Sequence, residues 1–184
     1  MPSITFDEAS RIILGEIEST LARMRSDEME ALRRALLQAG AVFVTGEGRS
    51  GLVARCFAMR LMHLGLRCHV VGETITPAIS NGDLLVAVSG TGETAVTSTL
   101  ARLAQKHGAR VAAVTGSEGS SLASGADLRV VVPAGGGRGE GSQQYGGSLF
   151  EQSALIALEA VVLQLQGELG QTKEQMDARH ATLE

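Results

Sequence analysis

Aromatic residues are scarce in this 184-residue chain, which has no tryptophan, one tyrosine and four phenylalanines. Single-stranded nucleic acids and flat ring systems are bound largely by stacking on aromatic side chains. The net charge of −4 also gives no general attraction to nucleic acid or to anionic membranes. We therefore expect no nucleic-acid partner, and an anionic ligand has to be held by local donors. A small phosphorylated sugar fits these limits.

Cysteine is scarce as well, and Cys56 and Cys68 have no C-x-x-C or metal-ligand spacing. We interpret both as buried, reduced thiols, and we expect no metal site. The N-terminus has no basic flank followed by an apolar run, and no stretch reaches the roughly 18 apolar residues of a membrane span. These absences predict a cytoplasmic protein without a membrane partner.

Short apolar runs alternate with helix-like stretches, which is typical of βαβ units around a parallel sheet. Apolar residues at helical spacing predict a first helix over 6–24 and a second helix with Ser26 as its N-cap. Strands are predicted at 41–45, 67–71, 84–88, 110–114 and 128–132. Helices are predicted at 50–64, 94–107, near 120 and at 148–167.

We therefore expect one α/β domain over 1–184, a three-layer α-β-α sandwich with a five-stranded parallel sheet. Two N-terminal helices occupy 1–39, the αβ core occupies 40–168, and a polar tail occupies 169–184. The tail is too hydrophilic to fold into the core unaided. The broad apolar face of the helix at 148–167 predicts burial against the sheet and a partner subunit. The glycine-rich segment at 134–147 predicts a flexible loop.

Two glycine-rich loops carry the strongest signal: GEGRSG at 46–51 and SGTGET at 89–94. Each follows a predicted strand and opens a predicted helix, so backbone N–H groups and a positive helix end point at one spot. Hydroxyl side chains add further donors. The two loops predict a phosphate site formed by Gly48, Arg49, Ser50, Ser89, Gly90, Thr91 and Thr94.

Other interpretations of these loops remain open at this point. GEGRSG also matches G-x-G-x-x-G, and Glu73 lies at the spacing that a dinucleotide fold requires. The second hydroxyl-rich loop favours one compact phosphomonoester over a pyrophosphate. Serine and threonine are also common as helix caps and turn residues. Arg49 either neutralises phosphate or lies on the surface, whereas Glu47 and Glu93 would repel a phosphate and are expected to position the backbone.

Several segments together carry a resemblance to a known family. They are GEGRSG, AMRLMHLG at 58–65, VVGETITP at 70–77, SGTGET, VAAVTG at 111–116, SLFEQ at 148–152 and RHATLE at 179–184. The chain resembles the 6-phospho-3-hexuloisomerases of the sugar isomerase (SIS) family over nearly its whole length. These isomerases tend to carry a Gln-Pro-Met-Gly-like run where this chain has Gln144, Tyr145, Gly146 and Gly147. The departure predicts a looser loop beside the site.

The resemblance implies an isomerase that interconverts D-arabino-hex-3-ulose 6-phosphate and D-fructose 6-phosphate through a cis-enediol, without cofactor or metal. It also implies a cytoplasmic homotetramer that serves the ribulose monophosphate pathway of formaldehyde assimilation. Alternatives are an SIS isomerase of another phosphosugar, such as arabinose 5-phosphate, and a non-catalytic sugar-phosphate sensor. A regulator usually carries an added DNA-binding domain, which disfavours the sensor.

Two residues are the catalytic candidates. Ser148 and Glu151 have the spacing of a capping box, so the residues alone leave Glu151 open between a helix cap and a base. The resemblance favours the base, because the family's catalytic glutamate stands at this position of its SLFE-like motif. His180 lies in the polar tail, where a solvated histidine is the default. The resemblance implies instead that His180 enters the site of a neighbouring subunit.

Overall fold

Five parallel strands and seven helices make up the described part of the chain, residues 4–135 and 141–183 of this computed structural model. In chain order they are α1 (Phe6–Ala22), α2 (Ser26–Gln38), β1 (Val42–Gly46), α3 (Gly48–His63), β2 (Cys68–Val70), β3 (Leu84–Ser89), α4 (Ala95–Lys106), β4 (Arg110–Thr115), α5 (Ser121–Gly125), β5 (Leu128–Val131), α6 (Ser148–Glu168) and α7 (Lys173–Asp177). Every predicted strand is present, with bounds that differ by one residue at most ends.

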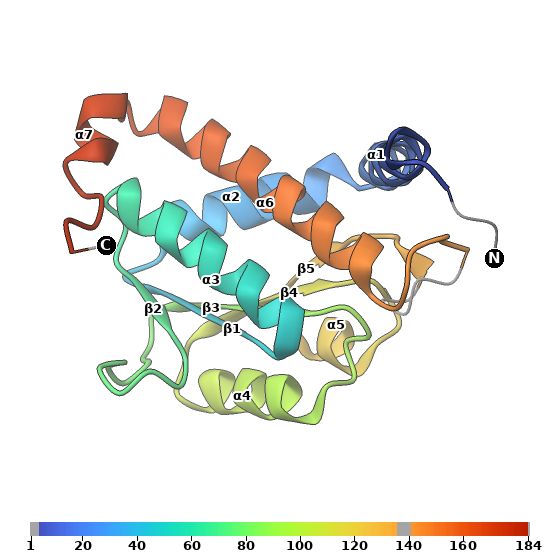
Figure 1. Ribbon diagram of the computed structural model, residues 1–184. Helices are drawn as coiled ribbons and strands as arrows, with labels where there is room; N and C mark the ends of the chain where they lie inside the picture. The colour runs from blue at the N-terminus through green and yellow to red at the C-terminus, as the bar shows by residue number, and fades with distance from the viewer. Residues whose placement is uncertain (1–3, 136–140, 184) are drawn as a thin grey trace.

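The sheet has the order β2-β1-β3-β4-β5, and all four pairings are parallel. Helices α1, α2, α3 and α6 lie on one side of it and α4 and α5 on the other (Figure 1). Alternation along β1 shows why: Val42 and Val44 pack with α2, α3 and α6, whereas Phe43 packs with α4. The predicted three-layer sandwich is therefore confirmed.

Helix α6 is the central helix of its layer. It is long and apolar enough to span a membrane by composition, but half of that window is buried inside the protein, as in the core helix of a globular domain. It packs against α1, α2 and α3. Ile156 and Leu163 remain exposed on its outer side, so the broad apolar face is only partly covered by this chain.

Two local expectations are wrong, the N-cap at Ser26 and the burial of both cysteines. Arg25, with an extended backbone, is the N-cap of α2, and Ser26 is already helical, so its hydroxyl does not cap. Cys56 is exposed on α3, and Cys68 is half-buried. Burial raises the pKa of the Cys68 thiol to about 12. The tail forms the short helix α7, which has no buried residue, although Met176 within it is partly buried against the core.

The predicted glycine-rich loop over 134–147 is described only in part, because residues 136–140 lie outside the described part. Its second half is fastened to α1 by the carboxylate of Glu16. Glu16 accepts hydrogen bonds from Ser142 Oγ (2.7 Å), Gln143 N–H (2.8 Å) and Gln144 Nε2 (3.0 Å). Burial raises the pKa of Glu16, but these three bonds outweigh burial and hold it below its usual 4.5. These bonds join residues 142–144 to α1, and the flexibility of the loop stays a prediction.

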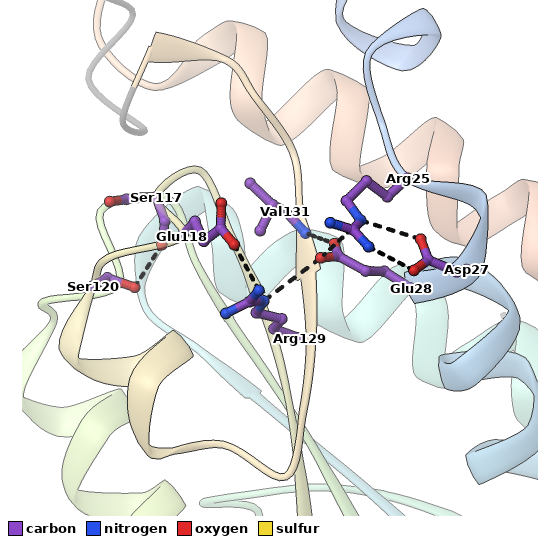
Figure 2. A network of polar contacts seen from close by, with 8 residues as sticks. All are labelled: Arg25, Asp27, Glu28, Ser117, Glu118, Ser120, Arg129 and Val131. Atoms are coloured by element: carbon purple, nitrogen blue, oxygen red, sulfur yellow. Dashed lines mark hydrogen bonds and ion pairs between the residues drawn. The ribbon is translucent and has the colours of Figure 1, made fainter.

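The outer strand β5 is covered by α2 through one carboxylate (Figure 2). Glu28 accepts the backbone N–H of Val131 at 2.9 Å, and its side chain is 10% exposed. Arg25 lies 3.7 Å from Glu28 and Arg129 lies 3.6 Å from it, so cations flank the carboxylate on both sides. Arg129 also pairs with Glu118 at 2.6 Å. A backbone donor of the edge strand is thereby satisfied without another strand.

Candidate active site

The order of the sheet reverses between β1 and β3. From β1 the chain runs outward to β2, crosses back to β3 on the other side of β1, and continues to β4 and β5. Open α/β sheets bind ligands in the crevice beyond the carboxyl ends of the strands at such a reversal. The loops 46–51 and 89–94 leave the carboxyl ends of these two strands, with Gly46 opposite Val88 in the ladder. The two predicted phosphate loops therefore lie side by side.

Close backbone approach explains the glycines of the first loop. A Cβ on Gly46 would lie 2.8 Å from the carbonyl oxygen of Val88, and a Cβ on Gly51 would lie 2.5 Å from the carbonyl oxygen of Gly46. Real Cβ atoms essentially never come so near to backbone oxygen. Gly48 has φ +56° and opens α3, and Ser50 is buried in the first turn of that helix. The loop is thus a tight strand-to-helix turn at the start of a long helix.

Arg49 joins the first loop to the start of α6. Its Nε donates to Oε2 of Glu151, which stands in the first turn of α6. The Glu151 side chain is 14% exposed and that of Arg49 61% exposed, so a guanidinium from the surface reaches a largely buried carboxylate. The structure thereby brings a predicted phosphate residue and the predicted base into direct contact.

The capping-box interpretation of Glu151 is wrong. The N-cap of α6 is Gly147, which has no side chain to bond the helix, and Ser148 already belongs to the helix. The Glu151 backbone N–H donates to the Gly147 carbonyl at 3.0 Å, as in any helical turn. Its carboxylate is therefore not engaged in capping and faces Arg49. The catalytic role assigned to it stays a prediction.

The hydroxyls of the second loop bond within the loop. Ser89 Oγ lies 3.0 Å from Thr94 Oγ1 and accepts the Gly92 N–H at 3.1 Å. Thr91 Oγ1 accepts the Glu93 N–H at 3.2 Å, whereas the Thr94 side chain makes no capping bond at the start of α4. These hydroxyls therefore make the contacts expected of turn residues. The Gly90 carbonyl accepts the N–H of Gly116, the residue after β4, at 2.9 Å.

Glu93 positions the backbone, as expected from its charge. Its carboxylate accepts the Ser121 N–H at 2.7 Å, at the start of α5. This backbone hydrogen bond lowers the pKa of Glu93 below its usual 4.5. In the first loop, Glu47 is exposed at the N-cap position of α3 and makes no side-chain capping bond. Glu73 pairs with Arg55 of α3, at 2.5 Å.

His180 lies at the far end of α3 from these loops. Its ring stacks on that of His63, with centroids 5.0 Å apart and planes 16° from parallel. Helix α3 runs 16 residues from the first loop to His63, which is about 24 Å at the rise of an α-helix. Within one chain the structure does not bring His180 to Glu151.

Sequence reasoning missed three contributors. Glu16 fastens residues 142–144, Arg179 holds the tail, and the buried His63 receives the His180 ring. His63 follows the helical apolar pattern of α3, which predicts burial but not its partner. The bonds from Glu16 to 142–144 and from Arg179 to His63 carry no local signal, because they join groups more than one hundred residues apart in sequence.

Comparison with known proteins adds independent findings. The family model described as SIS domain matches residues 35–142. A 3-hexulose-6-phosphate isomerase of Mycobacterium gastri is 46% identical over 94% of this chain and 88% of its own length. One of Bacillus subtilis is 40% identical over 94% of this chain and 95% of its own.

The fold has close solved counterparts. A structure from Methanococcus jannaschii, described as inferring a molecular function of 3-hexulose-6-phosphate isomerase, superposes with a TM-score of 0.83 at 29% identity. The match covers 96% of this chain and 99% of that one. The strand order and both loops therefore belong to an architecture shared along the whole chain.

Proposed function

The chain belongs to the SIS domain family, and we infer that it acts as a 3-hexulose-6-phosphate isomerase. It interconverts D-arabino-hex-3-ulose 6-phosphate and D-fructose 6-phosphate. The observation that carries this conclusion is the 46% identity over 94% of the chain to an enzyme of that name. The pair of loops at the reversal of the sheet supplies a physical site for such a substrate.

The substrate phosphate is held between the two loops that precede α3 and α4, at the carboxyl ends of β1 and β3. Gly48, Arg49 and Ser50 come from the first loop, and Ser89, Gly90, Thr91 and Thr94 come from the second. Backbone N–H groups at a helix start favour an anion, and a guanidinium adds a charge-assisted hydrogen bond. The Ser89–Thr94 hydroxyl pair can turn toward a phosphate because each hydroxyl is both donor and acceptor.

Glu151 transfers the proton. Starting from the 3-ulose, its carboxylate takes the proton from C2, and electrons move into a C2–C3 double bond to give the enediolate. The proton is returned to C3 while the hydroxyl proton on O2 passes to O3, so that the carbonyl moves from C3 to C2. Burial of the Glu151 side chain next to the buried Phe150 keeps water away from this step.

His180 of a neighbouring subunit assists opening and closure of the fructose 6-phosphate ring. The 3-ulose is open-chain because phosphorylation of O6 blocks its five-membered ring, so only the fructose side needs this help. Exposure of His180 at the far end of α3 supports action in another subunit, as does the exposed Leu163 on α6. The assembly is a cytoplasmic homotetramer that works in formaldehyde assimilation by the ribulose monophosphate route.

A coupled assay tests this function. Purified protein receives D-arabino-hex-3-ulose 6-phosphate, and fructose 6-phosphate is recorded as it forms, with a chelator present and arabinose 5-phosphate as the comparison substrate. We expect turnover of the hexulose phosphate and none of the pentose phosphate. Absence of turnover, together with a melting temperature raised by fructose 6-phosphate, would contradict the isomerase and point to a sensor.

A further inference from the structure

The tail after α6 is a built element rather than a loose end. Thr172 and Gln175 form a reciprocal capping box at the start of α7, and Met176 packs against the main core. Helix α7 lies beside the end of α3, next to the C-terminus (Figure 1). Chain ends are usually poorly ordered unless something ties them down. Specific contacts therefore have to hold this chain end in place.

The side chain of Arg179 joins the tail to α3. Three oxygen atoms accept from the two N–H groups of its Nη1, one of which is shared: the carbonyl oxygen of His63 (3.0 Å), Oε1 of Gln171 (2.9 Å) and the carbonyl oxygen of Gln175 (3.1 Å). One of these acceptors belongs to the end of α3 and the other two to the tail. The guanidinium thus joins the tail to α3 and also bonds Gln171 and Gln175 within the tail.

Gly65 provides the space for that guanidinium. A Cβ on Gly65 would lie 3.1 Å from Arg179 Nη2, 3.2 Å from Cζ and 3.4 Å from Nε. The guanidinium therefore lies against the bare backbone just after α3, where Gly65 has φ +86° and ends the helix. We call Arg179 with its three acceptors and Gly65 the Arg179 socket.

The socket fixes the residue that follows it. The His180 ring stacks on His63, whose carbonyl oxygen is an acceptor of the socket. His63 is 3% exposed, whereas His180 is exposed. His63 thus makes two contacts with the tail. Its carbonyl oxygen accepts from the Arg179 guanidinium, and its ring stacks on the His180 ring. If the tail moved away from α3, the hydrogen bond from Arg179 to His63 and the stacking of His180 on His63 would be lost together.

We propose that Arg179 is a positioning residue that presents the His180 ring to the site of a neighbouring subunit. This proposal rests on the function given above, in which His180 aids ring opening. A catalytic group displaced by about 1 Å commonly costs about 10²-fold in rate. Loss of the socket should therefore lower turnover without altering the loops that bind the phosphate.

Hydrogen exchange measures the anchor without any substrate. The backbone N–H groups of Ala178, Arg179 and His180 donate to Glu174, Met176 and Asp177. We expect Arg179→Gln to speed exchange in this segment and Arg179→Lys to retain part of the protection, because an ammonium keeps the charge and three donors on a flexible stem but lacks the planar guanidinium. Arg102→Gln on α4, which removes an exposed arginine bonded only to Thr99, is the matched control and should leave the tail protected.

Steady-state kinetics test whether Arg179 positions the His180 ring. From fructose 6-phosphate, Arg179→Gln should lower kcat about 10²-fold with KM little changed, and Arg179→Lys should fall between it and the wild type. Turnover from the open-chain 3-ulose should fall less. Combined with His180→Ala, Arg179→Gln should add no further loss, because both changes remove the same contribution.

Four results would overturn the proposal. They are unchanged exchange in Arg179→Gln, a loosened tail with unchanged kcat, additive losses in the double variant, and loss of the oligomer in both Arg179 variants, which would make Arg179 an assembly residue. A wild-type protein that leaves both hexulose phosphates unconverted would contradict the proposed function instead. The exchange experiment would still decide whether Arg179 anchors the tail.

Discussion

The two glycine-rich loops occupy equivalent places but use their side chains in opposite ways. In the first loop, Arg49 points away from the loop to Glu151 of α6. In the second loop, Ser89, Thr91 and Thr94 bond within the loop, and Glu93 bonds the start of α5. Both backbones are equally tight, since added Cβ atoms at Gly51 and Gly92 would collide with their surroundings.

The first loop is therefore expected to act mainly on the reaction, and the second mainly on the stability of the fold. A loop whose charged side chain reaches the predicted base can change activity without changing the fold. A loop whose polar groups satisfy one another contributes to stability first and to binding second. We therefore expect substitutions around the first loop to appear in kinetics and those in the second to appear in melting temperature.

The largest effect is expected at the carboxylate that the first loop contacts. Glu151→Gln keeps the shape and the hydrogen bond from Arg49 but cannot accept the substrate proton. We expect kcat to fall about 10²- to 10⁴-fold with a melting temperature close to the wild type. Glu159→Gln, on the exposed side of the same helix, is the matched control. Unchanged kcat would exclude Glu151 as the base.

Gly92→Ala should act on stability. A Cβ there would lie 2.1 Å from Ser120 Oγ and 2.8 Å from Thr115 Oγ1, and the residue has φ +67°. We expect a loss of about 1–3 kcal/mol in the free energy of unfolding, measured by denaturant titration. Gly119→Ala, in the same region but with nothing within 4 Å, should be nearly neutral. Equal losses in both variants would show that close packing is not the cause.

Arg49→Gln tests whether the first loop binds the phosphate. The Arg49 side chain is 61% exposed and that of Glu151 14%, so loss of the pair should lower the melting temperature modestly. Loss of the guanidinium should raise KM for the sugar phosphate by about tenfold. Arg55→Gln, on the same helix and paired with Glu73, is the control. An unchanged KM would limit Arg49 to holding Glu151.

The smallest effect concerns the acidic residue of each loop. The hydrogen bond from Ser121 lowers the pKa of Glu93, so its stabilising contribution is present above the carboxyl's usual 4.5 and is lost as pH falls through the lower folded value. Glu93→Gln should therefore melt slightly below the wild type at pH 7, and the gap should close in acid. Glu47→Gln, at an exposed side chain without a capping bond, is the matched control at pH 7. A gap that persists in acid would contradict this origin.

Patterns that repeat along the chain predicted most of the fold. Apolar runs gave the strands to within a residue or so, and the loops gave the side of the sheet where the site lies. Helix ends were harder, because the cap of α2 depends on the backbone angles of Arg25 and that of α6 on Gly147. The Glu16 and Arg179 contacts could not be predicted, because their acceptors and donors meet only after the chain has folded.

The covered edge at β5 has a consequence for how copies of this chain can associate. Exposed strand edges invite pairing with another chain and hence open-ended aggregation. At one edge, Glu28 occupies the N–H of Val131, and at the other β2 is only three residues long. Both edges therefore resist continuation of the sheet from one molecule into the next. In the proposed homotetramer, subunits would therefore meet through their helices rather than by extending the sheet.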